Sequence, residues 1–224
     1  VRTARERGRQ LFVLEQVAYN PGLASIREAL RSGALGRIVM YDSTLHDIYD
    51  WGEHSVHGYG TTSWRIQPDF PLGTLYDGGH HTIAQLSRLF GQPCAVTASG
   101  ESLRPEYGEY DHVLMLFEYA DGMHGVLSHS DYLGGGRNYF YIRGTEGVLS
   151  LGRDGGAITD REGRETRKLA FTRPHGHASM WHEAIACLEQ GREPCYPPED
   201  ALSDIITLHA IARSAAQRAR VEIR

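Results

Sequence analysis

The sequence predicts an α+β protein in which a mostly antiparallel, open sheet is flanked by helices. Five apolar or alternating runs follow one another in the second half of the chain, and turn-forming residues separate them. These runs cover residues 94–100, 112–120, 122–130, 138–144 and 147–152. Because successive strands joined by short turns lie antiparallel, we expect one sheet rather than a series of strand–helix–strand units.

Two helices are expected to close the chain after these strands. The first covers about residues 177–190, and the second, longer one follows Pro197 and Pro198. The apolar spacing of the second helix predicts a buried stripe. Its members are Leu202, Ile205, Ile206, His209 and Ala212.

Composition excludes several classes of protein. The 224 residues are 41% hydrophobic and 23% charged, which is ordinary for a soluble globular protein. A net charge of -5 without a basic stripe argues against a nucleic-acid partner, and no apolar run is long enough to cross a membrane. The three cysteines form no CxxC motif, so a reducing cytoplasm is the expected location.

The first part of the chain is expected to form a helix, a strand and a second helix. Residues 1–9 have helical character, and the apolar run at 11–19 suits a buried strand. Asn20 and Pro21 are typical of the start of a helix, which Gly33 would help to end.

A long polar and aromatic segment follows a strand-like run at residues 37–45. Its size and its content of His, Tyr, Trp and Gly favour a functional or a disordered loop. His46, His54 and His57 lie in it, but their spacing matches no helical or zinc-finger pattern. They either line a polar pocket, face solvent or hold a metal ion, and we expect no metal site.

The stretch 73–93 carries the strongest sign of chemistry. Asp77 and His81 are four residues apart, so they would share one face if a helix has begun by Asp77. The glycines at 78 and 79 would let a substrate or a backbone approach closely. A carboxylate that orients an imidazole is the minimal apparatus for moving a proton near neutral pH. The alternative is a helix start with Asp77 as its cap.

The order of these motifs resembles the Gfo/Idh/MocA family of NAD(P)-dependent oxidoreductases, over nearly the whole chain. The motifs are the Asn20-Pro21 turn, SGALGRI at 32–38, Trp64-Arg65, GTLYDGGHH at 73–81, LFGQP at 89–93 and RGTEGVLSL at 143–151. The resemblance implies a remnant of an N-terminal Rossmann domain at residues 1–19 and a substrate-binding and dimerisation domain at 20–224. It also implies that His81 is the acid/base, assisted by Asp77, on a sugar, cyclitol or related polyol.

The sequence departs from the family pattern where the cofactor would bind. It has no GxGxxG after an opening strand and no Glu-Lys-Pro motif. Ala18 stands in place of a basic residue that many members carry, and Ala84 in place of an acid. The intact family member would use NAD or NADP, whereas we expect this chain alone to bind neither.

Several other residues are candidates for the substrate site. Trp64 and Arg65 match the family segment before the Asp77 element, and Arg65 would grip a substrate oxygen or pair with an acid of the domain. Arg137 would reach the pocket from the sheet, and His80 is secondary because it points away from His81 on a helix. Tyr19 and Glu15 would border the site, with core or surface roles as the more common alternative.

Two further functions stay open at this point. A genuine short protein could catalyse cofactor-free elimination or isomerisation of a keto-sugar. The chain could also be a non-enzymatic binding or dimerisation module that uses a sheet face. The alternating face of Val113, Met115 and Phe117 suits a core or such an interface, and the core is the more common outcome.

Overall fold

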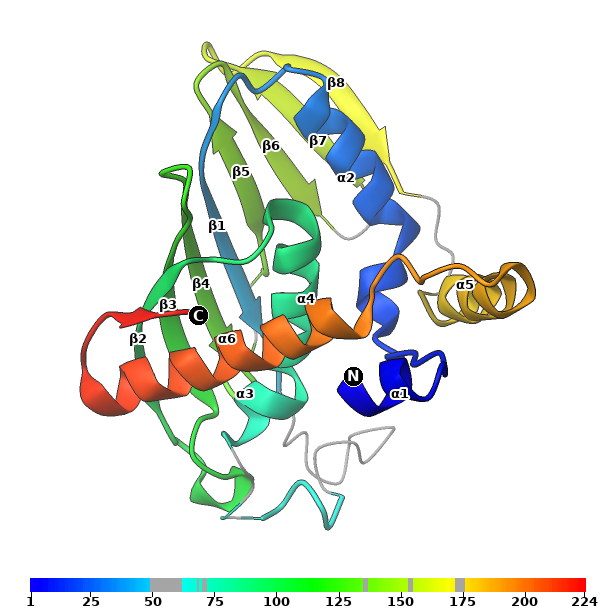
Figure 1. Cartoon of the computed structure of the whole chain (residues 1–224). Helices are drawn as coiled ribbons and strands as arrows, with labels where there is room; N and C mark the ends of the chain where they lie inside the picture. Colours follow the sequence, from blue (N-terminus) through cyan, green and yellow to red (C-terminus); the bar gives the residue numbers. More distant parts are fainter. Residues whose placement is uncertain (49–61, 68, 70–71, 135–136, 153–154, 172–175) are drawn as a thin grey trace.

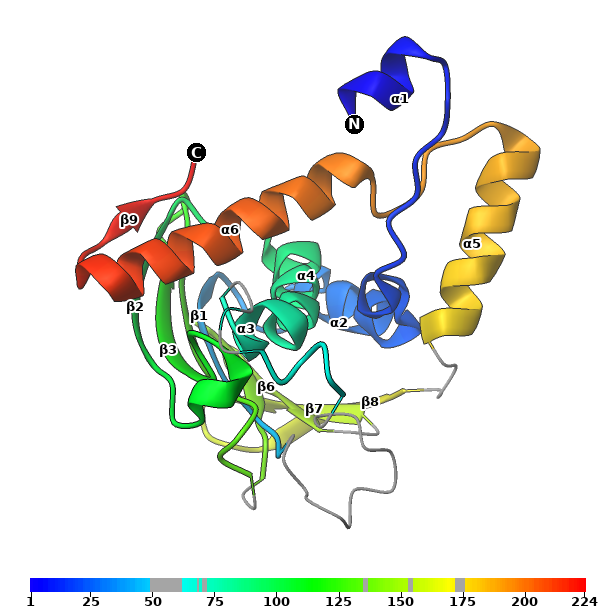
Figure 2. The same cartoon turned by 90° about the horizontal axis from the view of Figure 1, so that it is seen from below.

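A large, twisted sheet is the main element of the chain, and helices cover one of its faces (Figures 1 and 2). The computed structural model describes residues 1–48, 62–67, 69, 72–134, 137–152, 155–171 and 176–224. The helices are α1 (Arg2–Glu6), η1 (Gln16–Tyr19), α2 (Pro21–Arg31), α3 (Thr74–Asp77), α4 (Gly79–Phe90), η4 (Pro105–Tyr107), α5 (Gly176–Gln190) and α6 (Pro198–Gln217). The strands are β1 (Ile38–His46), β2 (Ala95–Glu101), β3 (His112–Glu118), β4 (His124–Ser130), β5 (Phe140–Gly144), β6 (Gly147–Gly152), β7 (Gly155–Asp160), β8 (Glu165–Ala170) and β9 (Val221–Glu222).

Within the described residues the sheet has nine strands in the order β8-β7-β6-β5-β1-β4-β3-β2-β9. Neighbouring strands are antiparallel except for β1 and β4, which pair in parallel at the centre. The expected α+β class with a mostly antiparallel open sheet is therefore confirmed. Each of the five expected strand runs contains a strand, and the polar turn at 161–164 joins β7 to β8.

Strand β3 shows how the sheet separates its two faces. Val113, Met115 and Phe117 are buried, as the core interpretation predicts, because they point toward the helices. Leu114 and Leu116 alternate with them and are 50% and 40% exposed on the opposite face. Successive side chains of a strand point to opposite faces, so one strand serves both the core and an open apolar surface.

Helices α2, α4 and α6 lie on the buried face of the sheet (Figure 2). The side chain of Asn20 accepts a hydrogen bond from the Gly22 amide, and Pro21 occupies the first turn, so α2 begins where the sequence predicts. Helix α4 contacts the sheet through Phe90, whose ring stacks on Tyr41 of β1 at a centroid distance of 4.8 Å. None of the helices in the described ranges is both long and apolar enough to span a bilayer.

The strand expected at residues 11–19 is wrong. Residues 10–15 form no regular element, and Gln16–Tyr19 is a 3-10 helix capped by the Glu15 side chain. Within this segment Ala18 and Tyr19 are buried against α4, α5 and the start of α6, in a small cluster with Met180, whereas Leu11 and Leu14 are 42% and 49% exposed. An apolar run predicts burial, but it forms a strand only where a neighbouring strand can pair with its backbone.

The buried stripe expected on α6 is only partly right: Ala212 is buried and Ile205 packs against the core, but other members of the stripe are not buried. Leu202 is 52% exposed and His209 is exposed, whereas Leu208 and Ile211 are fully buried. The buried face of α6 includes polar residues that make hydrogen bonds inside the domain. Asp204 accepts from Gln92 and Tyr196, Thr207 donates to Gln92, and Ser214 accepts from the Ala98 amide. Apolar periodicity cannot detect a face that is partly polar.

This assignment of the buried face of α6 can be tested by replacing single side chains with alanine. We expect Ile211→Ala to lower the free energy of unfolding by about 2–5 kcal/mol, because it opens a cavity in the core. Leu202→Ala is the matched control, and its effect should stay within about 0.5 kcal/mol because the side chain is mostly in solvent. Urea denaturation followed by circular dichroism measures both. Equal losses for the two variants would contradict the assignment.

Candidate active site

A break between α3 and α4 positions the histidine pair. Helix α3 ends at Asp77, Gly78 interrupts the helix, and α4 begins at Gly79. A Cβ at Gly79 would lie 2.9 Å from the Leu75 side chain and 3.6 Å from the His129 ring. The first contact is with the end of a flexible side chain and the second is an ordinary van der Waals contact, so protein atoms occupy the space that the sequence left open for a substrate.

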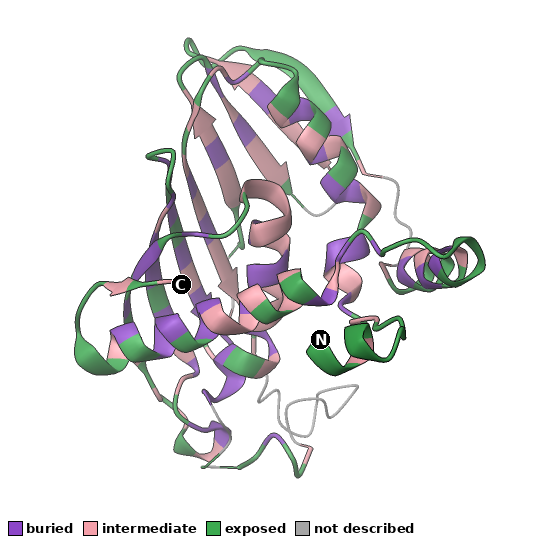
Figure 3. Cartoon of the chain, viewed as in Figure 1, coloured by how far each residue is buried: buried purple, intermediate pink, exposed green. Residues whose placement is uncertain are grey.

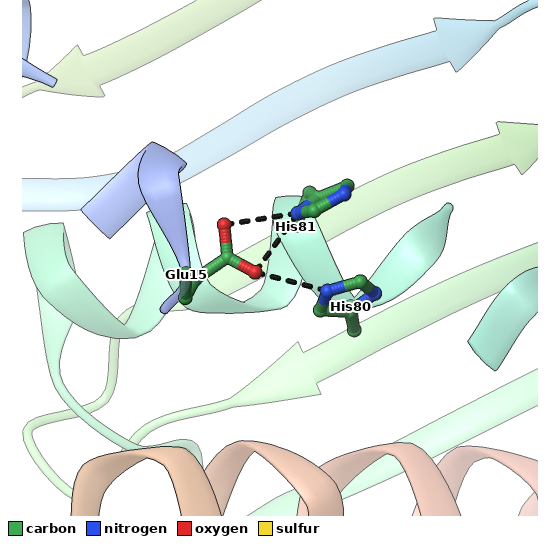
Figure 4. Close-up of side chains that lie close together, drawn as sticks. All are labelled: Glu15, His80 and His81. Atoms are coloured by element: carbon green, nitrogen blue, oxygen red, sulfur yellow. Dashed lines mark hydrogen bonds and ion pairs between the residues drawn. The ribbon is translucent and has the colours of Figure 1, made fainter. Parts of the chain in front are cut away.

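Glu15 and His81 form the closest polar contact of the site (Figure 4). His81 Nδ1 lies 2.9 Å and 2.8 Å from the two carboxylate oxygens of Glu15. A carboxylate only accepts hydrogen bonds, so Nδ1 carries a proton and donates it. The other ring nitrogen of His81 points away from Glu15 (Figure 4), and the side chain is 32% exposed.

His80 binds the same carboxylate. Its Nε2 lies 2.9 Å from Glu15 Oε2, and its Nδ1 lies 2.9 Å from the carbonyl oxygen of Tyr76. The imidazole rings of His80 and His81 are 3.9 Å apart between centroids. Both ring nitrogens of His80 face acceptors, so keeping both hydrogen bonds requires a proton on each.

Burial and hydrogen bonding shift the pKa of Glu15 in opposite directions, and the same is true of the pKa of His80. Glu15 is 4% exposed, and burial alone would raise the pKa of its carboxyl group. Hydrogen bonds from His80, His81 and the Val17 amide overcome this effect and lower the pKa of Glu15 to about 2. Burial lowers the pKa of His80, but its contacts with Glu15 outweigh burial and leave the pKa raised.

Asp77 is bound to Arg65 rather than to His81. Arg65 Nε and Nη2 lie 2.5 Å and 3.3 Å from the two Asp77 oxygens, and Arg65 is 6% exposed. The two carboxylates of the site therefore have different partners among the described residues, Arg65 for Asp77 and the histidines for Glu15. The expected shared helical face of Asp77 and His81 fails because the helix is interrupted between them.

The other predicted residues are spread around this centre. Trp64 is 49% exposed, and the Arg65 guanidinium lies 3.8 Å from the centre of its ring. Arg137 is exposed in the connection between β4 and β5, and no hydrogen bond or ion pair within the described ranges joins it to the histidine pair. His46 ends β1 and lies 2.7 Å from Ser128 Oγ, whereas His54 and His57 lie outside the described residues.

Among the residues that the structure describes, Glu15, His80 and His81 form a group whose ligand atoms lie close enough for a metal ion, all within 4.8 Å of one another. Each of these atoms already makes a hydrogen bond inside the group. We therefore interpret the group as a hydrogen-bonded cluster. A dinucleotide is a poor fit to the described residues, because no strand among them leads through a glycine-rich turn into a helix.

The role of Glu15 was not expected from the sequence. Its position bordered the predicted site, but the acidic residue was assigned to the core or the surface. The available signal was an acid inside the apolar run LFVLEQVAY, because a buried carboxylate requires hydrogen-bonding partners. Nothing in the sequence indicated that those partners lie 65 and 66 residues further along the chain.

The comparison with known families decides the membership of this chain. The family model described as "GFO/IDH/MocA C-terminal domain" matches residues 23–150 of this chain. The chain belongs to the GFO/IDH/MocA family. The resemblance drawn from the sequence motifs is thus confirmed.

Relatives of known structure or name support this membership. The scyllo-inositol 2-dehydrogenase (NADP(+)) of Bacillus subtilis is 27% identical over 165 residues, which are 73% of this chain and 44% of that protein. An oxidoreductase from Thermotoga maritima superposes with a TM-score of 0.83 at 24% identity, over 96% of this chain and 63% of that one. Levoglucosan dehydrogenase, solved with NADH and levoglucosan, gives a TM-score of 0.80 at 20% identity, over 99% and 68% of the two chains.

These structural similarities establish the fold. The chain spans between 37% and 55% of the length of the curated relatives that it matches. It is a member of an oxidoreductase family that includes sugar and polyol dehydrogenases, some of them solved with a nicotinamide dinucleotide.

The lowered pKa of Glu15 predicts how stability depends on pH. The folded-state pKa, about 2, is below the usual 4.5, so the stabilisation is present above 4.5 and is lost as the pH falls toward 2. For His80 the folded-state pKa is raised, so its stabilisation is present below about 6.5 and is lost as the pH rises through the raised value.

We expect Glu15→Gln to be less stable than the native chain at pH 5, by on the order of 3 kcal/mol. The difference should shrink steadily between pH 5 and pH 2, where the native carboxylate becomes protonated. Urea unfolding at a series of pH values measures it. A difference that does not change over this range would show that Glu15 has an ordinary pKa.

Proposed function

We propose that this chain forms the substrate-binding part of an NAD(P)-dependent oxidoreductase that acts on a sugar, cyclitol or related polyol. His81 transfers the proton of the substrate hydroxyl. The observation that carries the proposal is the position of His81 in a member of this family: one ring nitrogen is fixed by a buried carboxylate, and the other points away from it (Figure 4). A held, partly exposed imidazole is suited to general acid/base catalysis.

The chemistry of an alcohol dehydrogenase divides between cofactor and protein. A bound nicotinamide supplies the acceptor for the hydride of the carbinol carbon. The dinucleotide would be held outside the described residues, and residues 1–19 would adjoin its domain while residues 20–224 form the substrate domain. This chain contributes an imidazole that removes the hydroxyl proton and the side chains that orient the sugar.

Five other side chains complete the proposed site. Asp77 assists through its pair with Arg65, whose guanidinium it holds in one orientation. Trp64 offers an aromatic surface for the apolar face of a sugar ring. Arg137 supplies a further hydrogen-bond donor for substrate oxygens, and His80 contributes to the site through its contact with Glu15.

Cofactor-free elimination or isomerisation of a keto-sugar is the second candidate. It would use the same histidine, since removal of a proton next to a carbonyl also requires a base. The two functions differ in their need for nicotinamide. A keto-sugar that is converted without NAD(P), in a reaction abolished by His81→Gln, would replace the first proposal by the second.

Ligand binding by the purified chain tests the proposed function. We expect isothermal titration calorimetry with a panel of cyclitols, aldoses and anhydro-sugars to find at least one ligand, and His81→Gln to weaken its binding. His124→Gln is the control, because His124 is exposed at the start of β4. We expect no binding of NAD(H) by the chain itself. A panel without any ligand, or tight binding of NADH, would contradict the proposal.

Catalysis gives a second, independent measurement. Where the natural protein oxidises a polyol with NAD(P)+, we expect His81→Gln to lower kcat by about 10²–10⁴-fold, the range typical of a lost general acid/base. An unchanged kcat would remove His81 from the mechanism.

We also propose that the chain forms a homo-oligomer in the cytoplasm through the open face of the sheet. Leu114, Leu116 and Val126 are between 40% and 50% exposed there, and Leu116 and Val126 are direct neighbours across β3 and β4. Contiguous exposed apolar side chains on a flat face favour a protein contact.

Light scattering after size exclusion tests this contact. We expect the native chain to have the mass of a dimer or a larger oligomer, and Leu116→Lys to reduce it to a monomer by burying a charge in the contact. Leu188→Lys is the matched control, since Leu188 is 60% exposed on α5, away from the sheet. A monomeric native chain would exclude the proposed assembly.

A further inference from the structure

Two imidazoles meet at one carboxylate, and their contacts call for three ring N–H donors, whereas two neutral imidazoles carry only two. A neutral imidazole has one donor nitrogen and one acceptor nitrogen. His81 uses one nitrogen toward Glu15, whereas His80 uses both, one toward Glu15 and one toward the Tyr76 carbonyl. His81 can therefore be neutral in this arrangement, but His80 cannot.

We propose that Glu15 is the positioning residue of the site: it holds His81 as the Nδ1–H tautomer with a bare Nε2, while His80 is an imidazolium that balances the Glu15 charge. The proposal rests on the proposed function in one respect, the use of Nε2 as the proton acceptor. The tautomer and the charge of His80 follow from the contacts alone.

The burial of Glu15 makes this assignment specific. Its carboxylate is 4% exposed and accepts three donors, from the Val17 amide, His80 and His81. A carboxylate without solvent cannot turn to other partners, so the direction of the His81 Nδ1–H bond is fixed by the backbone that precedes η1. The lowered pKa of Glu15 and the raised pKa of His80 agree with an ionised pair.

The charge of His80 matters for His81, which binds the same carboxylate. Oε2 of Glu15 accepts from both imidazoles, and the positive charge of a doubly protonated His80 balances the charge of the carboxylate. When Nε2 accepts a hydroxyl proton, His81 becomes an imidazolium whose Nδ1–H remains on Glu15.

Among the described residues, the charged or titratable neighbours Asp77 and Tyr196 have partners of their own. Asp77 of α3 is paired with Arg65. Tyr196, which precedes α6 and interacts with Glu15, donates its hydroxyl to Asp204, and its pKa is raised by burial, so the phenol is neutral. The ionised partners left to act on His81 in this part of the structure are Glu15 and His80.

Nitrogen-15 NMR of the labelled, purified chain tests the assignment without any substrate. At pH 8 we expect His81 to show a protonated Nδ1 and a bare Nε2. We expect both nitrogens of His80 to remain protonated above pH 6.5, the ordinary pKa of a histidine. A His81 with the proton on Nε2, or a neutral His80 at pH 6.5, overturns the proposal even if no variant folds.

Two variants separate positioning from simple packing. Glu15→Gln keeps the volume but removes the charge, so the imidazolium fraction of His80 at pH 7.5 should fall several-fold. Glu15→Asp restores the charge but shortens the reach by one methylene, so it should partly restore the His80 charge without restoring the His81 tautomer. His124→Gln should leave both histidines unchanged. Identical titration curves in the native chain and in Glu15→Gln would show that Glu15 only fills space.

A sugar or polyol that binds the chain distinguishes this proposal from the proposed function. Such a ligand should shift the Nε2 resonance of His81 more than its Nδ1 resonance. If the tautomer is as assigned but no ligand perturbs Nε2, the positioning role stands and the proposed function fails. If a ligand perturbs His81 in the opposite tautomer, the function stands and the positioning role fails.

Discussion

The parallel pairing of β1 with β4 determines where the rest of the structure can lie. Antiparallel neighbours can be joined by a tight turn, but parallel strands require a long crossover that returns the chain from the end of one strand to the start of the next. In this chain the crossover carries α3, α4, β2 and β3 before it returns as β4. Helix α4 is thereby laid across the buried face, and its first turn, with His80 and His81, faces the segment before α2.

The same crossover explains why the site depends on distant parts of the sequence. Gly79 packs against His129 of β4, which is fully buried. The chain before η1 then brings Glu15 over the histidines, where a buried carboxylate could not persist without donors. Close packing below and a buried acid above thus hold the imidazoles from two sides.

The sequence was informative where a structure follows from local patterns. Alternating apolar residues and turn chemistry located the strands, because each strand of an antiparallel sheet buries one face. The same reasoning failed at residues 11–19 and in part on α6. There burial depends on which element lies opposite, and Thr207 and Ser214 are buried because their hydroxyls are hydrogen-bonded. Histidines 80 and 81 could be selected from their motif, but their partner could not, since no local rule connects Glu15 to them.

The two carboxylates of the site show why residue spacing alone misassigned the partner of His81. Asp77 has the right spacing, but the guanidinium of Arg65 binds both of its oxygens, and a bidentate pair leaves little capacity for an imidazole. Glu15 has no useful spacing, yet it lies within 2.9 Å of both histidines. Each acid has its own partners, Arg65 for Asp77 and the two histidines for Glu15. A neutral imidazole with one nitrogen fixed is the form in which the other nitrogen can accept a proton.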